Sequence, residues 1–258
     1  MAAKIHPTAI VDPAAEIADD DVEIGPYCVI YAGVKLGAGC WLQNNVTIDG
    51  PCEIGERNRF HAYCSIGQRT QDLKYEGGPT TLRIGDDNTF REFCTANRAT
   101  SPGNATVIGN SNNFLAYSHV AHDCIVGNHI IFSNNSTLGG HVSIDDHAII
   151  GGLTGIHQFC RIGSYVITGG FTKIVQDIPP YMIADGNPAK VRAVNVVGLQ
   201  RHDFSEDAIR LIKKAHRFLY RENLNASDAL EAIGELKDPE KILTPLIDFV
   251  STTERGIH

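Results

Sequence analysis

The segment Ser118–Cys124 reads SHVAHDC and places two histidines, an aspartate and a cysteine in one short stretch. These residue types suit three kinds of chemistry: a metal site, a cysteine nucleophile paired with a histidine, or a histidine base beside a carboxylate. The same residues could also do no more than pack a core. Which side chains face inward decides between these alternatives, so the periodicity of the chain has to be established first.

The chain repeats every six residues over most of its length. Positions at multiples of six from Ile24 to Ile174 are mostly Val, Ile, Leu or Phe, and Gly, Asn and Asp are common directly after them. This is not a helical period. It fits a three-sided parallel β-helix, with one hexapeptide per side and about 18 residues per coil. Gly, Asn and Asp tolerate the tight corners between the sides.

Two polar stretches interrupt the repeat. Asp72 and Gly78 occupy apolar positions within residues 67–83, and Pro102 does so within residues 97–107. We expect both ranges to form loops ejected from the coil. Long loops on a rigid scaffold commonly carry function, although they can also be tolerated insertions.

The repeat fades near Pro179, Pro180 and Pro188, which mark a boundary in the chain. We therefore expect two domains, a β-helix over residues 1–187 and an α-helical domain over residues 188–258. Ser205 should cap a helix, and two further helices are expected near residues 226–236 and 239–250. The first helix carries a basic patch, which is either a solvated face or a docking surface for an acidic partner; its residues are Arg210, Lys213, Lys214, Arg217 and Arg221.

All the cysteines share one phase of the repeat. Each of the seven lies two residues before a multiple of six, and residues two apart on a strand face the same side. We expect them all in the core as small hydrophobic side chains, which removes Cys124 from the catalytic candidates. No two are one regular coil apart, so we expect none to stack on adjacent coils. An odd number without CxxC pairs favours reduced thiols in a cytoplasm.

The histidines are expected to converge instead. His141 and His157 follow His122 by about one and two coils of roughly 18 residues, so the three should climb one edge of the prism, with His119 facing outward beside them. Zinc binding remains possible. Asp123 next to His122 favours a general base, because a nearby carboxylate stabilises the imidazolium. No G-x-S-x-G nucleophile motif occurs, so we expect direct attack by a substrate hydroxyl on an activated acyl donor.

Bulk composition excludes several classes of protein. The 258 residues carry a net charge of −8, with 43% hydrophobic and 20% charged residues. Nothing indicates general affinity for nucleic acid. The start of the chain does not have the pattern of a signal peptide, and no apolar run approaches the roughly 18 residues of a membrane span. We expect a cytoplasmic protein with no membrane span.

Beyond the hexapeptide repeat, four segments are similar to the UDP-N-acetylglucosamine O-acyltransferase family of hexapeptide acyltransferases. They are QDLKYEGGPT (71–80), SHVAHDCIVGN (118–128), GGLTGIHQFCRIG (151–163) and QDIPPYMIADGNPAKVRAVNVVGLQR (176–201). With the ending STTERGI, the resemblance covers nearly the whole chain. It implies a left-handed parallel β-helix followed by helices, a homotrimer, and active sites between subunits.

The resemblance also implies roles for individual residues. His122 would be the general base, Asp123 its partner, and the N–H of Gly140 the oxyanion donor. Asp72 and Lys74 would hold the sugar nucleotide, with Gln71 nearby. Four residues would line the acceptor and pantetheine cleft: His119, His141, His157 and Gln158. Asn195 and Arg201 would bind the nucleotide or donor, and Gly170 would leave room for a long acyl chain.

The implied reaction transfers a 3-hydroxyacyl chain from acyl carrier protein to the 3-hydroxyl of UDP-N-acetylglucosamine, the first step of lipid A biosynthesis. No cofactor and no metal are implied, and the basic helix would receive the acidic carrier protein. Two alternatives remain: the N-acyltransferase of the same pathway, which carries an extra N-terminal domain, and a zinc enzyme like gamma-class carbonic anhydrase. Val197 and His202 depart from the family's expected Glu and Arg, which weakens the roles expected around the nucleotide.

Overall fold

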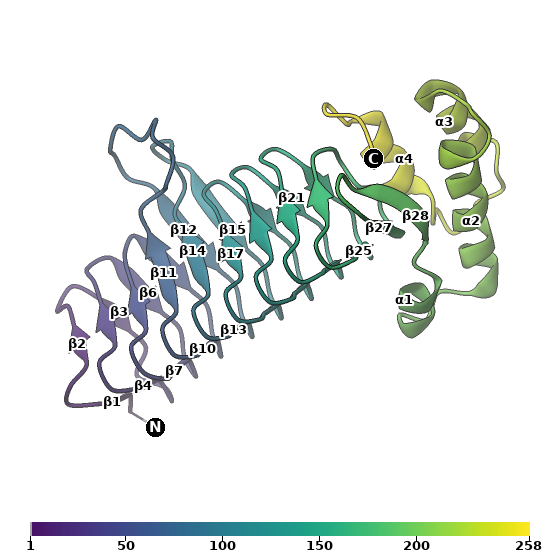
Figure 1. Ribbon diagram of the computed structural model, residues 1–258. Helices are drawn as coiled ribbons and strands as arrows, with labels where there is room; N and C mark the ends of the chain where they lie inside the picture. The colour runs from purple at the N-terminus through teal and green to yellow at the C-terminus, as the bar shows by residue number, and fades with distance from the viewer. Residues whose placement is uncertain (1) are drawn as a thin grey trace.

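The computed structural model describes residues 2–258 and shows a triangular prism of β-coils capped by helices at one end. The coils climb from the N-terminus to the helices in Figure 1. This confirms the predicted parallel β-helix with a helical C-terminal region, of the left-handed type that the resemblance implies. Three sheets, called A, B and C, form the three sides of the prism within these residues.

The strands are short, and up to β27 consecutive strands belong to different sheets. In sheet A their order is β1 (Lys4–Ile5), β4 (Glu23–Ile24), β7 (Trp41–Leu42), β10 (Arg59–Phe60), β13 (Thr89–Phe90), β16 (Asn113–Phe114), β19 (Ile131–Phe132), β22 (Ile149–Ile150), β25 (Ile167–Thr168), β27 (Met182–Asp185) and β28 (Lys190–Val194). In sheet B it is β2 (Ile10–Val11), β5 (Val29–Ile30), β8 (Thr47–Ile48), β11 (Ser65–Gln68), β14 (Thr95–Asn97), β17 (His119–Val120), β20 (Thr137–Leu138), β23 (Gly155–Ile156) and β26 (Lys173–Ile174). In sheet C it is β24 (Arg161–Ile162), β21 (Ser143–Ile144), β18 (Ile125–Val126), β15 (Ala105–Ile108), β12 (Thr81–Ile84), β9 (Cys52–Ile54), β6 (Val34–Leu36) and β3 (Glu16–Ile17).

Inward-facing side chains stack from coil to coil. Phe60, Phe90, Phe114 and Phe132 form one column, with ring centroids 5.0, 4.4 and 4.7 Å apart in that order, and all four are fully buried. Each coil therefore packs on its two neighbours, which is how a short repeat builds a continuous core.

All seven cysteines are free and buried, as predicted. The expectation that none would stack on adjacent coils is wrong for one pair. Phe60 pairs with Phe90 and Ser65 with Thr95, so Cys64 and Cys94 face each other on neighbouring coils. The reason is the intervening loop, which lengthens this coil without moving its ends.

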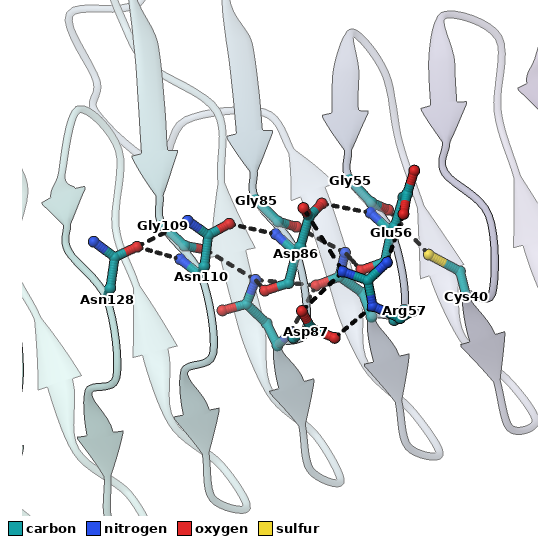
Figure 2. A network of polar contacts seen from close by, with 12 residues as sticks. Cys40, Gly55, Glu56, Arg57, Gly85, Asp86, Asp87, Gly109, Asn110 and Asn128 are labelled. Carbon is teal, nitrogen blue, oxygen red and sulfur yellow. Dashed lines mark hydrogen bonds and ion pairs between the residues drawn. The ribbon is translucent and has the colours of Figure 1, made fainter.

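A ladder of side chains fixes the corner between sheets C and A (Figure 2). The Oδ1 atoms of Asp146, Asn128 and Asn110 each accept the backbone N–H of the equivalent residue one coil below, Asn128, Asn110 and Asp86, at 2.7–2.8 Å. Asp86 does the same for Glu56 at 2.7 Å. These corner N–H groups lie between strands, so the side chains supply the acceptors that the sheets do not.

Two segments leave the coil between β11 and β12 and between β14 and β15, and they protrude on the same side in Figure 1. They touch each other, since the N–H of Gly103 donates to Pro79 O at 2.8 Å and that of Thr81 to Asn104 O at 3.1 Å. The two segments therefore form one protruding unit beside the corner between sheets B and C.

The helices follow β28, the one antiparallel neighbour in the sheets of residues 2–258. They are α1 (Val196–Arg201), α2 (Glu206–Tyr220), α3 (Ala226–Gly234) and α4 (Thr244–Ser251). Ser205 caps α2 as predicted. α4 begins later than expected, because the carboxylate of Asp238 accepts the N–H groups of Ile242 and Leu243 and holds a turn there.

The division of the chain into two domains near residue 187 stays a proposal. Strand β28, which lies beyond that residue, still belongs to sheet A, and helical structure begins only at Val196. Along residues 2–258, no helix is both long and apolar enough to span a membrane.

Candidate active site

His122 and Asp123 follow β17, at the corner between sheets B and C. His122 Nδ1 lies 2.8 Å from Asp123 Oδ2 and 3.0 Å from Thr100 Oγ1. The backbone N–H of Thr100 donates to the same Asp123 Oδ2 at 3.0 Å, and the N–H of Asp123 donates to Thr106 Oγ1 at 2.8 Å. The pair predicted to be base and carboxylate is therefore a connected, partly buried unit.

Asp123 is held in its charged form. Burial alone would raise the pKa of its carboxyl, but hydrogen bonds from His122 and Thr100 outweigh burial and leave the pKa below its ordinary value. A carboxylate that stays ionised next to His122 Nδ1 accepts a hydrogen bond from that nitrogen, which then carries the hydrogen. It therefore favours the tautomer with a lone pair on Nε2.

Gly140, on the next coil, lies directly against the imidazole. A Cβ on this residue would sit 2.4 Å from Cε1 and 2.5 Å from Nε2 of His122, so only glycine leaves the ring in place. The carbonyl of Gly140 accepts the N–H of Phe159, whereas its own N–H meets no protein acceptor anywhere in residues 2–258. A free N–H near the free nitrogen of a base suits an oxyanion contact.

The other histidines share this corner but not one column. The N–H of His141 donates to His122 O; its ring is perpendicular to that of His122 at 5.3 Å and its Nε2 lies 3.8 Å from Asp123 Oδ2. Leu138 pairs with Ile156, which places Gln158 rather than His157 opposite Gly140. The three histidines therefore climb one edge of the prism on consecutive coils, as predicted, but spacings that differ from whole coils by one residue place them in neighbouring columns.

His157 instead faces the C-terminal segment. Its Nδ1 lies 3.4 Å from Arg255 Nη2 and 3.1 Å from Gln158 O. His119 faces outward from β17, as expected, with Nδ1 2.7 Å from Thr95 Oγ1. Burial, with a smaller effect from the charge of His122, lowers the pKa of His119, so this residue favours the neutral form.

Gln71, Asp72 and Lys74 lie on the first protruding segment, where they are exposed or half-buried. Asp72 Oδ1 accepts the N–H of Lys74 at 2.9 Å, so this carboxylate shapes its own turn. Gln71 and Asp72 line an open hollow of about 750 Å³. Asp72 is connected to His122 by hydrogen bonds through Thr70 and Thr100.

Asn195 and Arg201 lie elsewhere, on the outer side of sheet A. Asn195 is nearly buried and caps α1, accepting the N–H of Gly198 and donating to Tyr165 O. Arg201 is exposed at the end of α1 and borders an apolar hollow that includes Ile149 and Ile167. The side chain of Asn195 is already occupied by these structural hydrogen bonds, whereas the exposed side chain of Arg201 is available to bind an anion.

Val197, Gly170 and His202 occupy distinct surroundings. Val197 is exposed and also lines the hollow beside Arg201. His202 packs on the rings of His147 and Tyr165, with centroids 4.6 and 5.1 Å away. Gly170 is an exposed corner residue, where a Cβ would meet only Gly152 O at 3.4 Å. A side chain there would project from the surface.

Thr70, Thr100 and Arg255 were missed by sequence reasoning. The first two fall in the ranges expected to be loops, which singled out the segments but not these hydroxyls. No spacing rule links residues of two separate loops to His122. Arg255 belongs to the quoted ending STTERGI, but nothing in that motif indicated contact with His157.

One group of possible metal ligands is present within residues 2–258. The candidate atoms of His122, Asp123 and His141 lie within 4.8 Å of one another. However, His122 Nδ1 and Asp123 Oδ2 face each other, and Thr100 contacts both. A metal ion would have to displace these hydrogen bonds, so the geometry favours the base and carboxylate.

Comparisons with known proteins point to one family of acyltransferases. Residues 177–258 match the family described as UDP N-acetylglucosamine O-acyltransferase, domain 2, and residues 33–68 match the bacterial transferase hexapeptide repeats. The chain is 45% identical to acyl-[acyl-carrier-protein]–UDP-N-acetylglucosamine O-acyltransferase of Thiobacillus denitrificans, over 99% of each chain. It is 47% identical to the protein of that name from Paracidovorax citrulli, over 98% of each. The crystal structure of UDP-N-acetylglucosamine O-acyltransferase from Moraxella catarrhalis superposes with a TM-score of 0.94, at 41% identity and 98% coverage of both chains.

Proposed function

The chain belongs to the UDP-N-acetylglucosamine O-acyltransferase family, and on that premise we propose how its residues carry out the reaction. The protein is an acyltransferase that moves an acyl chain from acyl carrier protein to UDP-N-acetylglucosamine, the first step of lipid A biosynthesis. In our proposal the chain transferred is a 3-hydroxyacyl group and the acceptor atom is the sugar 3-hydroxyl. The observation that carries the mechanism is the bonded His122–Asp123 pair.

His122 acts as the general base. With Nδ1 donating to Asp123, Nε2 takes the proton of the sugar hydroxyl as its oxygen attacks the thioester carbonyl. The negative charge on the thioester oxygen is stabilised by the N–H of Gly140. The C–S bond then breaks while the new C–O bond remains, and the imidazolium returns its proton to the leaving thiolate.

The substrate-binding roles follow the placement of the remaining residues. Asp72 and Lys74 hold the sugar nucleotide on the protruding segment, with Gln71 nearby; Gln71 and Asp72 border its open hollow, and Lys74 is exposed beside them. Of the cleft residues, His141, His157 and Gln158 lie at the same corner as the base on the following coils, and His119 lies beside it on β17. Arg201 contributes a cation on the far side of the prism for the nucleotide or the donor, and Asn195 supports it as the cap of α1.

We propose a homotrimer with active sites between subunits, because one chain holds the two halves of the site on different sides. His122 lies where sheets B and C meet, whereas Arg201 lies over sheet A. A substrate that contacts both therefore needs two chains. Leu73 on the protruding segment is fully exposed in the single chain, as expected of a residue that a neighbouring subunit covers.

The helical region suits a negatively charged carrier protein. Four of the basic residues predicted in one helix lie on α2 and the fifth, Arg221, is its C-cap; Lys213 and Lys214 are exposed. Charge complementarity of this kind speeds encounter with an acidic partner. We propose a cytoplasmic location, where acyl carrier protein would be available.

The test is an assay with UDP-N-acetylglucosamine and a panel of 3-hydroxyacyl carrier proteins. His122→Ala should lower kcat by about 10²–10⁴-fold, as for loss of a general base. His129→Ala is the matched control, since His129 is exposed on a different corner, and it should keep wild-type kcat. Near wild-type kcat in His122→Ala would contradict the mechanism. Stoichiometric zinc required for activity would favour the metal enzyme, and faster acylation of an amino-sugar acceptor would favour N-acyl transfer.

Gly170 is proposed to set the length of the acyl chain. Gly170→Met should shift preference towards shorter chains, because its side chain would project where the glycine leaves open space. An unchanged chain-length preference across the donor panel would remove Gly170 from this role.

A further inference from the structure

We propose that Thr70 and Thr100 are positioning residues that couple the acceptor-binding segment to the tautomer of the catalytic base. This inference rests on the proposed role of His122. It concerns how the base is held ready, and it assigns both threonines a part in the reaction without contact with the reacting atoms.

The threonines form a continuous chain of hydrogen bonds to the base. Thr70 Oγ1 lies 2.8 Å from Thr100 Oγ1, and Thr100 Oγ1 lies 3.0 Å from His122 Nδ1. At the other end, Thr70 Oγ1 accepts the N–H of Asp72 at 3.1 Å. Thr70 is only 6% exposed. Water therefore competes little for these bonds, and their directions depend on each other.

The chemistry of the base sets the direction of the chain. His122 can accept a proton at Nε2 only while Nδ1 carries hydrogen, and that N–H points to Asp123 and Thr100. Nδ1 then has no free lone pair, so the hydroxyl of Thr100 cannot donate a hydrogen bond to it. Its hydrogen goes instead to Thr70 Oγ1, which keeps an acceptor lone pair for it.

Without the Thr70 acceptor, the hydroxyl of Thr100 is free to turn towards His122 Nδ1. That hydrogen bond would favour the tautomer with hydrogen on Nε2, which cannot remove a proton. The Asp123 carboxylate opposes this change, so the threonine pair reinforces a preference that already exists. We expect an effect on rate smaller than that of removing the base.

The pair also links two segments that are remote in sequence. Thr70 belongs to the protruding segment that carries Gln71 and Asp72, and Thr100 belongs to the second segment. The Thr100 backbone N–H holds Asp123 at 3.0 Å, so one residue touches both members of the dyad. When the sugar nucleotide orders the first segment, Thr70 is held in place to accept from Thr100, and the base is fixed in its reactive form.

The experiment is a double-mutant cycle in the full-length enzyme with Thr70→Val, Thr100→Val and the double variant. Valine keeps the shape of threonine and removes only the hydroxyl. Loss of one neutral hydrogen bond corresponds to about 3–10-fold in rate, and loss of one to a charged group to about 10–100-fold. We expect kcat to fall about 3–10-fold in Thr70→Val and about 10–100-fold in Thr100→Val, with KM for the acyl carrier protein within about twofold.

The cycle and its controls distinguish coupling of Thr70 to His122 through Thr100 from a purely structural role, in which the threonines only hold the two loops together. The double variant should be no slower than Thr100→Val alone, because Thr70 acts through Thr100. Thr100→Ser should restore most of the rate. Thr80→Val is the matched control, since Thr80 is a buried threonine of the same segment, and it should leave kcat unchanged. Imidazole ¹⁵N spectra should show His122 protonated on Nδ1 in the wild type and partly shifted in Thr70→Val.

Several results would overturn the inference. Multiplicative losses in the double variant would show that the threonines act independently. Loss of rate in Thr80→Val, no rescue by Thr100→Ser, or an unchanged ¹⁵N spectrum would each indicate a purely structural role. If His122→Ala abolishes turnover while Thr100→Val retains it in full, only this inference fails. If His122→Ala keeps turnover, the proposed mechanism fails first.

Discussion

Replacing Asp123 with asparagine isolates the contribution of one negative charge. Both hydrogen bonds to this side chain end on the same atom, Oδ2, from His122 Nδ1 at 2.8 Å and from the Thr100 N–H at 3.0 Å. The amide oxygen of asparagine can occupy that position and accept both. The side chain is 6% exposed, so the variant should fold with the same contacts and without the charge.

The expected loss lies between two limits. A hydrogen bond to a charged group contributes about 1 kcal/mol more than a neutral one, which is the lower limit. Full attraction between an imidazolium and a carboxylate 2.8 Å apart is about 6 kcal/mol at an effective dielectric constant near 20, which is the upper limit. With 1.36 kcal/mol per tenfold in rate, we expect kcat of Asp123→Asn to fall by roughly 10²–10³-fold.

Steady-state kinetics provide the assay, with kcat of Asp123→Asn compared with that of the wild type. Stability gives a second measurement. The lowered pKa of Asp123 stabilises the fold above its ordinary value near 3.9, and this contribution disappears as pH falls through the folded-state pKa. Acid unfolding below about pH 4 should therefore be shallower in Asp123→Asn. A kcat within threefold of wild type would refute the assigned role.

Three further outcomes test the fold and the site. Phe90→Ala removes a ring stacked on both sides and should reduce the free energy of unfolding by about 3–5 kcal/mol in urea titrations. The exposed ring of Phe93 is a control that should cost far less. Gly140→Ala forces the His122 ring to move and should lower kcat at least about 10²-fold with little change in Tm; normal kcat would mean that the ring position does not matter. Burial raises the pKa of Cys124 to about 12 and shields all the thiols, so iodoacetamide at pH 8 should label none in the native protein, and rapid labelling would contradict the core assignment.

The hexapeptide phase was enough to predict the prism, the buried cysteines and the corner that carries His122. Each of these depends on a local rule, that every sixth residue packs inward. Helix α2 was also predictable, since Ser205 marks its start and apolar residues follow at helical spacing.

What the sequence could not supply was the length of each coil. The loops make Phe60 pair with Phe90 and Phe90 with Phe114, so Cys64 stacks on Cys94 although their numbers suggest otherwise. The same difficulty affected the histidines, because a difference of one residue from a whole coil moves His141 and His157 into neighbouring columns. Residues such as Thr100 escape any periodic rule, since they reach the site from loops whose path is set by packing between loops.

The separation of His122 and Arg201 on different sides of the prism has a consequence for genetics. In the proposed ring of three subunits, each active site takes its base from one chain and its distant cation from the next. Chains with His122→Ala and chains with Arg201→Ala would each be defective alone. Mixed and reassembled in equal amounts, they would regain about a quarter of the sites, because a site is intact whenever two sound halves meet. Two individually inactive alleles expressed together would then support growth that neither supports by itself.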